Sequence, residues 1–183
     1  MNIIVSHSDS GGYYFRPDNT LVRGSELFYL PGAISHIEIV PAIAVKIDRA
    51  AKGLSRQFAH RYISVYTYGL LIYAHAGTDT LREILRTTLD NTTYISENFL
   101  PIESIPEELE ISLTIHNQSY SYKIAPTFKE SIYELIEKIA IHSSLKTGDL
   151  IFMEMGEKRQ AEPGSSILLS LADQSEIMAI EIK

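Results

Sequence analysis

The sequence offers few residues whose types and spacing could carry out chemistry. It has six histidines and no cysteine, which excludes thiolate zinc sites, cysteine nucleophiles and disulfides. The histidines never stand at metal-ligand spacing from one another; they occupy positions 7, 36, 60, 75, 116 and 142. His36 and Glu38 would share one face of a strand, about 7 Å apart at the backbone. That spacing permits chelation but is more typical of a surface pair.

The other sequence motifs do not indicate a specific reaction any more clearly. Ser143 and Lys146 match the SxxK spacing of penicillin-binding enzymes, but they follow a predicted helix instead of beginning one. We find no phosphate-binding glycine loop, zinc-protease, nucleophile-elbow or EF-hand pattern. The tyrosines at positions 62, 66, 68 and 73 stand among β-branched residues, which favours strand packing over a binding platform.

The composition of the chain disfavours several classes of protein. The chain has 183 residues, 45% of them hydrophobic, and a formal net charge of -7. This balance, without any run of Lys or Arg, disfavours nucleic-acid binding. No stretch of about 18 apolar residues and no basic leader is present, so we expect no membrane span and a cytoplasmic location. The length favours one domain over residues 1–183.

The elements that would position these residues are mostly strands. Alternating or β-branched segments predict strands at 27–30, 36–47, 62–75, 111–116, 119–124, 150–153, 167–171 and 177–182. Three short helices are expected at 55–62, at 78–88 and after Thr127, which forms a capping-box pattern with Glu130. Residues 1–12 are expected to be irregular and residues 97–110 an acidic loop. Pro41 predicts a sheet edge or a bulge. The scattered order indicates an α+β fold.

Several short segments together resemble the fumarylacetoacetate hydrolase family. They occur in the family's order over residues 13–183: Tyr14–Val22, Phe28–Pro31, Ala44–Ile47, Phe58–Tyr62, Leu145–Phe152 and Glu162–Gly164. The resemblance implies a mixed β-sandwich roll and a homodimer. It also implies Mg²⁺ or Mn²⁺ held by three carboxylates, which serves C–C hydrolysis, decarboxylation or tautomerisation of keto acids and dicarbonyl compounds.

The family's active-site residues are missing at the matching positions. Its ExE pair falls on Val40 and Ala42, and the aspartate of its GxDxTARD strand falls on Leu71. The arginine and aspartate that end this motif become His75 and Ala76. The family's substrate-side lysine maps near Thr87, its TGTP motif becomes residues 153–156, and its N-terminal catalytic segment has no counterpart, so the match is to a shortened member. Since hydrocarbon side chains give no oxygen to a cation, no cofactor is expected.

The resemblance therefore predicts a catalytically inactive member with a binding or structural role. Its partner would be a second copy or an active paralogue. One alternative is a metal-dependent enzyme with displaced ligands, for which Glu38, Glu154 and Asp79 are the candidates. A second alternative is metal-free binding of a small molecule in the vestigial pocket, which would be lined by Thr67, Tyr73, His75, Met153 and Glu154.

Overall fold

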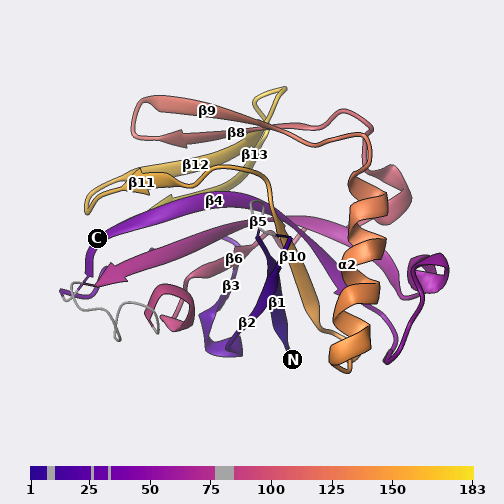
Figure 1. Cartoon of the computed structure of the whole chain (residues 1–183). Helices are drawn as coiled ribbons and strands as arrows, with labels where there is room; N and C mark the ends of the chain where they lie inside the picture. The colour runs from indigo at the N-terminus through magenta and orange to yellow at the C-terminus, as the bar shows by residue number, and fades with distance from the viewer. Residues whose placement is uncertain (8–10, 26, 33, 77–84) are drawn as a thin grey trace.

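The computed structural model describes residues 1–7, 11–25, 27–32, 34–76 and 85–183. The two sheets and the long helix of this described part are shown in Figure 1. The N-terminal half contains β1 (Ile3–Ser6), β2 (Tyr13–Arg16), η1 (Asp18–Thr20), β3 (Leu21–Arg23), β4 (Ile34–Ile47), η2 (Arg56–Arg61), β5 (Ile63–Ala76), β6 (Thr93–Ile95) and β7 (Leu100–Pro101). The remainder contains η3 (Ile102–Ser104), β8 (Glu110–Ile115), β9 (Gln118–Lys123), α2 (Phe128–His142), β10 (Leu150–Glu154), β11 (Arg159–Ala161), β12 (Ser166–Leu171) and β13 (Glu176–Glu181).

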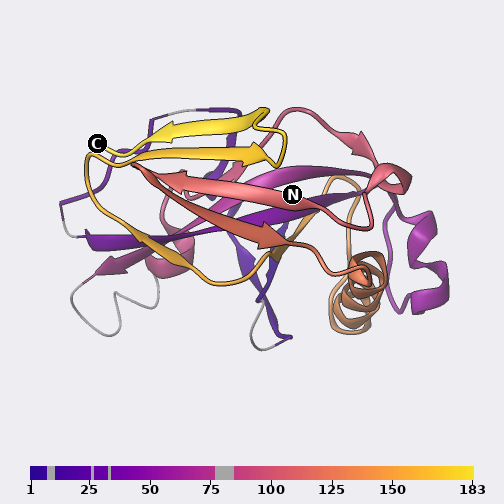
Figure 2. The same cartoon turned by 90° about the horizontal axis from the view of Figure 1, so that it is seen from above.

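The long strands β4 and β5 form the centre of the larger sheet. Its main order is β2-β1-β10-β4-β5-β6-β3, with β11 paired to β4 and β7 paired to β5. The smaller sheet has the order β13-β12-β8-β9 and lies across the larger one, as the view from above shows (Figure 2). Both parallel and antiparallel pairs occur in the larger sheet. This arrangement is the predicted α+β, mostly β roll.

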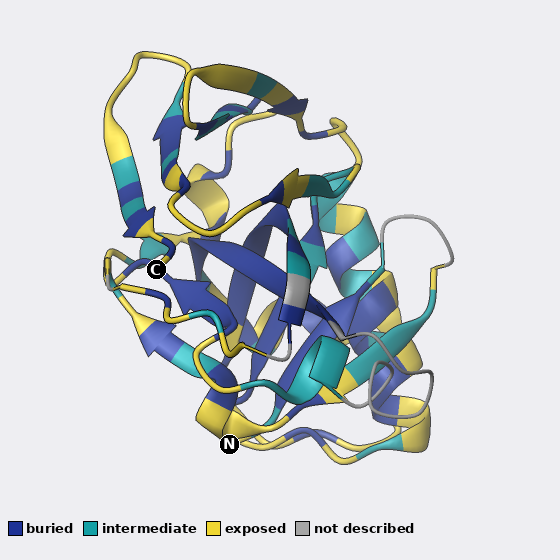
Figure 3. Cartoon of the chain, turned by 90° about the vertical axis from the view of Figure 1, so that its left-hand side faces the viewer, coloured by how far each residue is buried: buried dark blue, intermediate teal, exposed yellow. Residues whose placement is uncertain are grey.

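The main core includes residues of both sheets and of α2, and a smaller buried cluster lies on the other face of β4 and β5. Figure 3 shows the buried residues concentrated on the central strands, with exposed residues on the connections. Tyr66 and Tyr73 are fully buried and Tyr68 nearly so, which confirms that the tyrosines pack within the protein. Within the described residues, no helix is long and apolar enough to span a membrane.

The prediction for the first dozen residues is wrong for residues 3–6. They form β1, which pairs in parallel with β10 and in antiparallel with β2. Asp149 holds the strand in place: its carboxylate accepts hydrogen bonds from the backbone and side-chain nitrogens of Asn2, at 2.7 and 2.9 Å. Because an apolar segment this short has no visible period, its strand character depends on a partner far away in the sequence.

Pro41 lies neither at a sheet edge nor at a bulge, the two places that its type predicts, but in the middle of β4, where its pairing with Leu70 keeps the register. It falls between the part of β4 that pairs with β10, from Ala42 onward, and the part that pairs with β11, up to Ile39. Its carbonyl accepts a hydrogen bond from the backbone nitrogen of Met155, so this side of Pro41 faces the break between the two partners. A missing N–H donor is tolerated there because the ladder is interrupted.

The positions of the helices agree with the sequence predictions better than their capping hydrogen bonds do. Helix α2 buries the predicted stripe of Ile132, Leu135, Ile136 and Ile139. Thr127 is its N-cap but makes no side-chain capping bond, and neither does Ser55 before η2. The predicted helix 78–88 is seen only at residues 85–88, because residues 77–84 lie outside the described part. The strand expected at 27–30 is reduced to one bridge, between Phe28 and Ile182.

Candidate functional site

The three positions that the resemblance assigns to metal ligands lie together on one face of the larger sheet. Val40 of β4 pairs with Leu71 of β5. Ala42 lies opposite Gly69 of β5 and Glu154 of β10. Because directly opposed residues of antiparallel strands project to the same face, these side chains form one surface. The sequence comparison thus selects positions that are neighbours in space.

This surface is an apolar cluster. Val40, Ala42 and Leu71 have no exposed surface. The other buried members of the cluster are Ile3, Val5, Ala44, Tyr73, Ile95, Leu150 and Phe152. The ring of Phe152 lies so close to Gly69 that a Cβ added there would approach Cε1 to 2.8 Å. Side chains therefore fill the centre of this face.

The residues of this face do not fit a divalent metal ion. Mg²⁺ and Mn²⁺ take oxygen ligands, and the aliphatic side chains at positions 40, 42 and 71 provide none. Throughout the part of the chain that the structure describes, no three His, Asp or Glu side chains are grouped so that they could hold a metal ion. Asp79, one of the predicted substitutes, lies outside that part.

Glu154 projects beside the apolar cluster, and its charge is compensated. The Tyr73 hydroxyl donates to its Oε1. The Lys158 ammonium lies 3.0 Å from its Oε2, and His7 Nδ1 lies 3.7 Å from the same oxygen. The side chain of Glu154 has no exposed surface. A buried carboxylate is tolerated only with such partners, so Glu154 serves an internal network.

Two tyrosines extend this network. The hydroxyls of Tyr14 and Tyr73 are 2.5 Å apart. Since the single proton of Tyr73 goes to Glu154, Tyr14 must donate to Tyr73, which gives a relay from Tyr14 through Tyr73 to Glu154. Burial raises the pKa of both phenols; the Arg16 guanidinium nearby partly opposes this rise. Both therefore stay protonated near neutral pH and act as hydrogen-bond donors.

Arg16 covers the relay. It is 3% exposed, and its Nη1 donates to the Thr92 carbonyl at 2.9 Å and to Thr93 Oγ1 at 3.1 Å. Its guanidinium carbon lies 4.5 Å from the centre of the Tyr73 ring. The Lys158 ammonium approaches the same ring to 4.8 Å. The Arg86 guanidinium carbon lies 5.7 Å from the ring centre, so Tyr73 is held by its hydroxyl and by three cations beside its ring.

His75 belongs to a group that adjoins Tyr73 on the same face of the sheet, two residues farther along β5. Its Nε2 lies 2.8 Å from Glu38 Oε2, and its ring stacks on that of His36 with centroids 4.5 Å apart. Arg86 Nη2 lies 4.0 Å from the same Glu38 oxygen. Glu38, expected to form a surface pair with His36, therefore binds the histidine of the neighbouring strand. Thr87, the position of the family's lysine, follows Arg86 in the helical residues 85–88.

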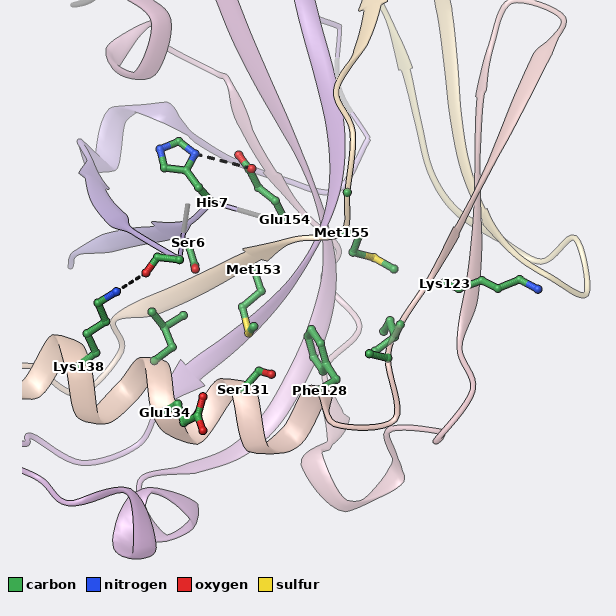
Figure 4. Close-up of a pocket in the computed structure, with 15 residues that line it drawn as sticks. Ser6, His7, Lys123, Phe128, Ser131, Glu134, Lys138, Met153, Glu154 and Met155 are labelled. Atoms are coloured by element: carbon green, nitrogen blue, oxygen red, sulfur yellow. Dashed lines mark hydrogen bonds and ion pairs between the residues drawn. The ribbon is translucent and has the colours of Figure 1, made fainter. Parts of the chain in front are cut away.

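Of the five residues predicted to line one pocket, Thr67, Tyr73, His75 and Glu154 share one face of the larger sheet, whereas Met153 alternates to the other face. Met153 and Glu154 line a pocket of about 520 Å³ between β10 and α2 (Figure 4). Tyr73 is fully buried and reaches Glu154 only through its hydroxyl. Thr67 donates to the carbonyls of Ser96 and Asn98, and so fastens β5 to the segment after β6.

Sequence reasoning missed Tyr14, Arg16, Lys158 and His7 as members of the site. Tyr14 and Arg16 alternate on β2, which places both on the face of the apolar cluster through the pairing of β2 with β1. The alternation is visible in the sequence, but the neighbour of β2 is not. Lys158 follows β10 in the turn toward β11, where no periodicity marks its direction.

Comparisons with known proteins agree on the family. Residues 5–177 match the sequence profile of the family described as fumarylacetoacetate (FAA) hydrolase, C-terminal. A sequence search among curated proteins gives no match.

Solved structures with this fold include three whose reported functions differ. Fumarylpyruvate hydrolase from Pseudomonas aeruginosa, solved with Mn²⁺ and pyruvate, superposes with a TM-score of 0.81 at 13% identity, over 100% of this chain and 89% of that one. Maleylpyruvate hydrolase from Sphingobium sp. SYK-6, solved with manganese and pyruvate, superposes with a TM-score of 0.80 at 15% identity, over 99% of this chain and 69% of that one. The 5-carboxymethyl-2-hydroxymuconate delta-isomerase from Mycobacterium smegmatis superposes with a TM-score of 0.80 at 15% identity, over 99% of this chain and 78% of that one.

At these identities the structures establish the fold, and the profile match spans nearly the whole chain. The chain therefore belongs to the fumarylacetoacetate hydrolase family.

Proposed function

We propose that this chain is a catalytically inactive member of its family with a binding or structural role. One observation carries the proposal: Val40, Ala42 and Leu71 lie fully buried in one apolar cluster at the positions matched to metal carboxylates. The resemblance requires a metal for the family's reactions on keto acids and dicarbonyl compounds. Here those positions carry hydrocarbon side chains, which cannot bind the metal that this chemistry requires.

The enzyme alternative requires carboxylates that have moved to new positions. Of the described candidates, Glu154 is engaged by Tyr73 and Lys158. Glu38 is engaged by His75. A cation would have to displace these partners from both residues and still find further oxygens. The contacts thus favour an inactive protein over one with displaced ligands.

Binding of a small molecule in the predicted vestigial pocket is also disfavoured. Tyr73 has no exposed surface, and Phe152 occupies the space beside Gly69. A ligand could contact the apolar cluster only if these side chains moved. A metal-free binding role would therefore use another surface of the protein.

The test is a thermal-shift titration with Mn²⁺ and Mg²⁺, each with and without oxalate as a keto-acid mimic. We expect no shift. A working site at 100 times its dissociation constant would add about 2.7 kcal/mol, or roughly 5–10 °C for a domain of this size. The Sphingobium hydrolase, which was solved with manganese, serves as the positive control. A saturable rise in this chain would overturn the proposal.

We also propose that the binding or structural role is exercised as a homodimer or beside an active paralogue, following the family resemblance. Light scattering coupled to size exclusion gives the mass directly. A monomer at micromolar concentration would count against the homodimer, and co-purification with an active paralogue would identify the second form.

A further inference from the structure

A serine and a histidine lie within hydrogen-bond distance of each other in a cavity at the end of the smaller sheet. Ser165 Oγ is 3.1 Å from His116 Nε2. Both residues line a cavity of about 410 Å³, between the turn of the β8–β9 hairpin and the segment from β11 to β12. That size is within the range of about 300–1,000 Å³ that small-molecule sites occupy. None of the lining residues belongs to the apolar cluster, so the positions of the lost metal ligands are not involved.

Backbone contacts hold the two side chains in place. His116 is the first residue of the two-residue turn between β8 and β9, and its φ of 52° lies in the left-handed region that favours glycine. Its N–H donates to the Ser166 carbonyl at 2.9 Å, which ties the turn to β12. The Ser165 N–H donates to the Glu162 carbonyl at 3.0 Å. A residue held in an unfavourable backbone conformation is a reason to look for a function there.

The hydrogen bonds of Ser165 set the direction in which its proton can move. The backbone N–H of Glu162 donates to Ser165 Oγ at 3.1 Å. Within the part of the chain that the structure describes, the hydroxyl proton of Ser165 has one acceptor, His116 Nε2. This network assigns the imidazole proton to Nδ1 and leaves Nε2 as the base. A nucleophile and its base are expected about 2.6–3.2 Å apart, and the Glu162 N–H would stabilise negative charge that develops on Oγ.

The rest of the cavity suits an uncharged acyl group. Among the described lining residues, Glu162 alone carries a full charge at neutral pH, so the cavity has no cation to attract an anionic donor. The Tyr120 hydroxyl donates to Gln118 Oε1 at 2.7 Å, which fixes this amide and leaves its NH₂ group to donate to an acyl carbonyl oxygen. Ile115 and Ala161 add hydrocarbon to the lining.

We propose that Ser165 is an acyl acceptor that takes one acyl group from an activated, uncharged ester. Oγ forms a bond to the carbonyl carbon while its proton passes to His116 Nε2. The bond between that carbon and the leaving oxygen then breaks, and the leaving group takes the proton from His116. The acyl group remains on Oγ, so the product is a modified serine and the family's metal-dependent turnover is not restored. This site uses no metal, so it can fail or hold independently of the proposed function.

The experiment is mass spectrometry with peptide mapping after incubation with p-nitrophenyl acetate in the presence of EDTA. We expect acetylation of Ser165 to be at least about a hundredfold faster than that of Ser119, which is exposed on the β8–β9 hairpin. Ser165→Ala should remove this modification. His116→Gly should slow it by about a hundredfold or more, because glycine accepts the backbone conformation but supplies no base, and added imidazole should restore part of the rate. His142→Gly, exposed at the end of α2, should leave the rate unchanged.

Melting of each variant without reagent shows that it is folded. An absence of acetyl on Ser165 in the wild type would overturn the proposal, as would a rate no faster than that at Ser119. An unchanged rate in folded His116→Gly, or a slower rate that imidazole does not restore, would show that the histidine only braces the turn, and would overturn it too. A metal response in the titration above would refute the loss of the metal site and leave the assignment of Ser165 unaffected.

Discussion

Replacing Tyr73 by phenylalanine tests whether the buried relay stabilises the fold. The change keeps the ring, its packing and its contact with Arg16, and removes only the hydroxyl between Tyr14 and Glu154. Tyr14 then loses its acceptor and a buried carboxylate loses a donor. A hydrogen bond to a charged group contributes about 1.5–3 kcal/mol, and an unsatisfied buried hydroxyl adds to the loss. We expect the free energy of unfolding to fall by about 3 kcal/mol.

Urea denaturation followed by circular dichroism measures this quantity. The midpoint should fall without a change in slope, because the surface exposed on unfolding is the same. In thermal unfolding the variant should melt roughly 6–12 °C lower. The matched control is Tyr120→Phe, whose hydroxyl bonds to Gln118 on an exposed hairpin, and it should stay within about 0.5 kcal/mol of the wild type.

A double-mutant cycle separates the relay from general packing. Tyr73→Phe and Glu154→Gln should each destabilise, with a coupling energy of about 1–3 kcal/mol between them. If Tyr73→Phe changes stability by less than about 0.5 kcal/mol, or if the two changes add without coupling, the network does not hold this face together and the reasoning is refuted.

Three further predictions concern the same framework. The two phenols of the relay have raised pKa values, so stability should be complete below the ordinary tyrosine pKa near 10.0 and fall as the pH rises above it. Because the chain has eleven tyrosines, absorbance at 295 nm is compared between the wild type and Tyr73→Phe: the two should ionise the same number of tyrosines before unfolding, and one more in the folded wild type would contradict this. Asp149→Ala should cost about 2–3 kcal/mol in urea, because Asn2 and Lys146 lose their acceptor; a value near zero would mean that water replaces it. Gly69→Ala should destabilise by about 1–3 kcal/mol through contact with a ring and a carbonyl at 2.8 Å, whereas Gly32→Ala meets no atom within 4 Å and should be neutral.

The sequence predicts the elements that have a strong local pattern. Strands β4 and β5 are long and rich in β-branched residues and tyrosine, and the stripe of α2 repeats at helical spacing. The hairpin of β8 and β9 likewise agrees with its alternation. The family can be recognised from short segments because their order along the chain is preserved, even though each segment alone is a weak signal.

The site is harder to predict because its members meet only through tertiary pairing. The relay joins residues of β2, β5 and β10, with Lys158 added from the turn that follows. Their alternation is visible, but which strands adjoin is not. The pocket expected from the resemblance stays a prediction; of its five residues, Met153 is the one that alternation along β10 turns to the opposite face from Glu154.

The parallel pairing of β1 with β10 has a consequence for how the chain reaches its native state. Asn2 and Asp149 are 147 residues apart, so β1 leaves the ribosome long before its partner exists. At about 5–20 residues per second, the wait is roughly 7–30 s. During this time the backbone of β1, whose Ile3, Ile4 and Val5 are fully buried in the finished protein, can pair only with β2. Non-local pairing of this kind slows folding and exposes the chain to aggregation. We therefore expect yields of folded protein to improve at low temperature or with added chaperones.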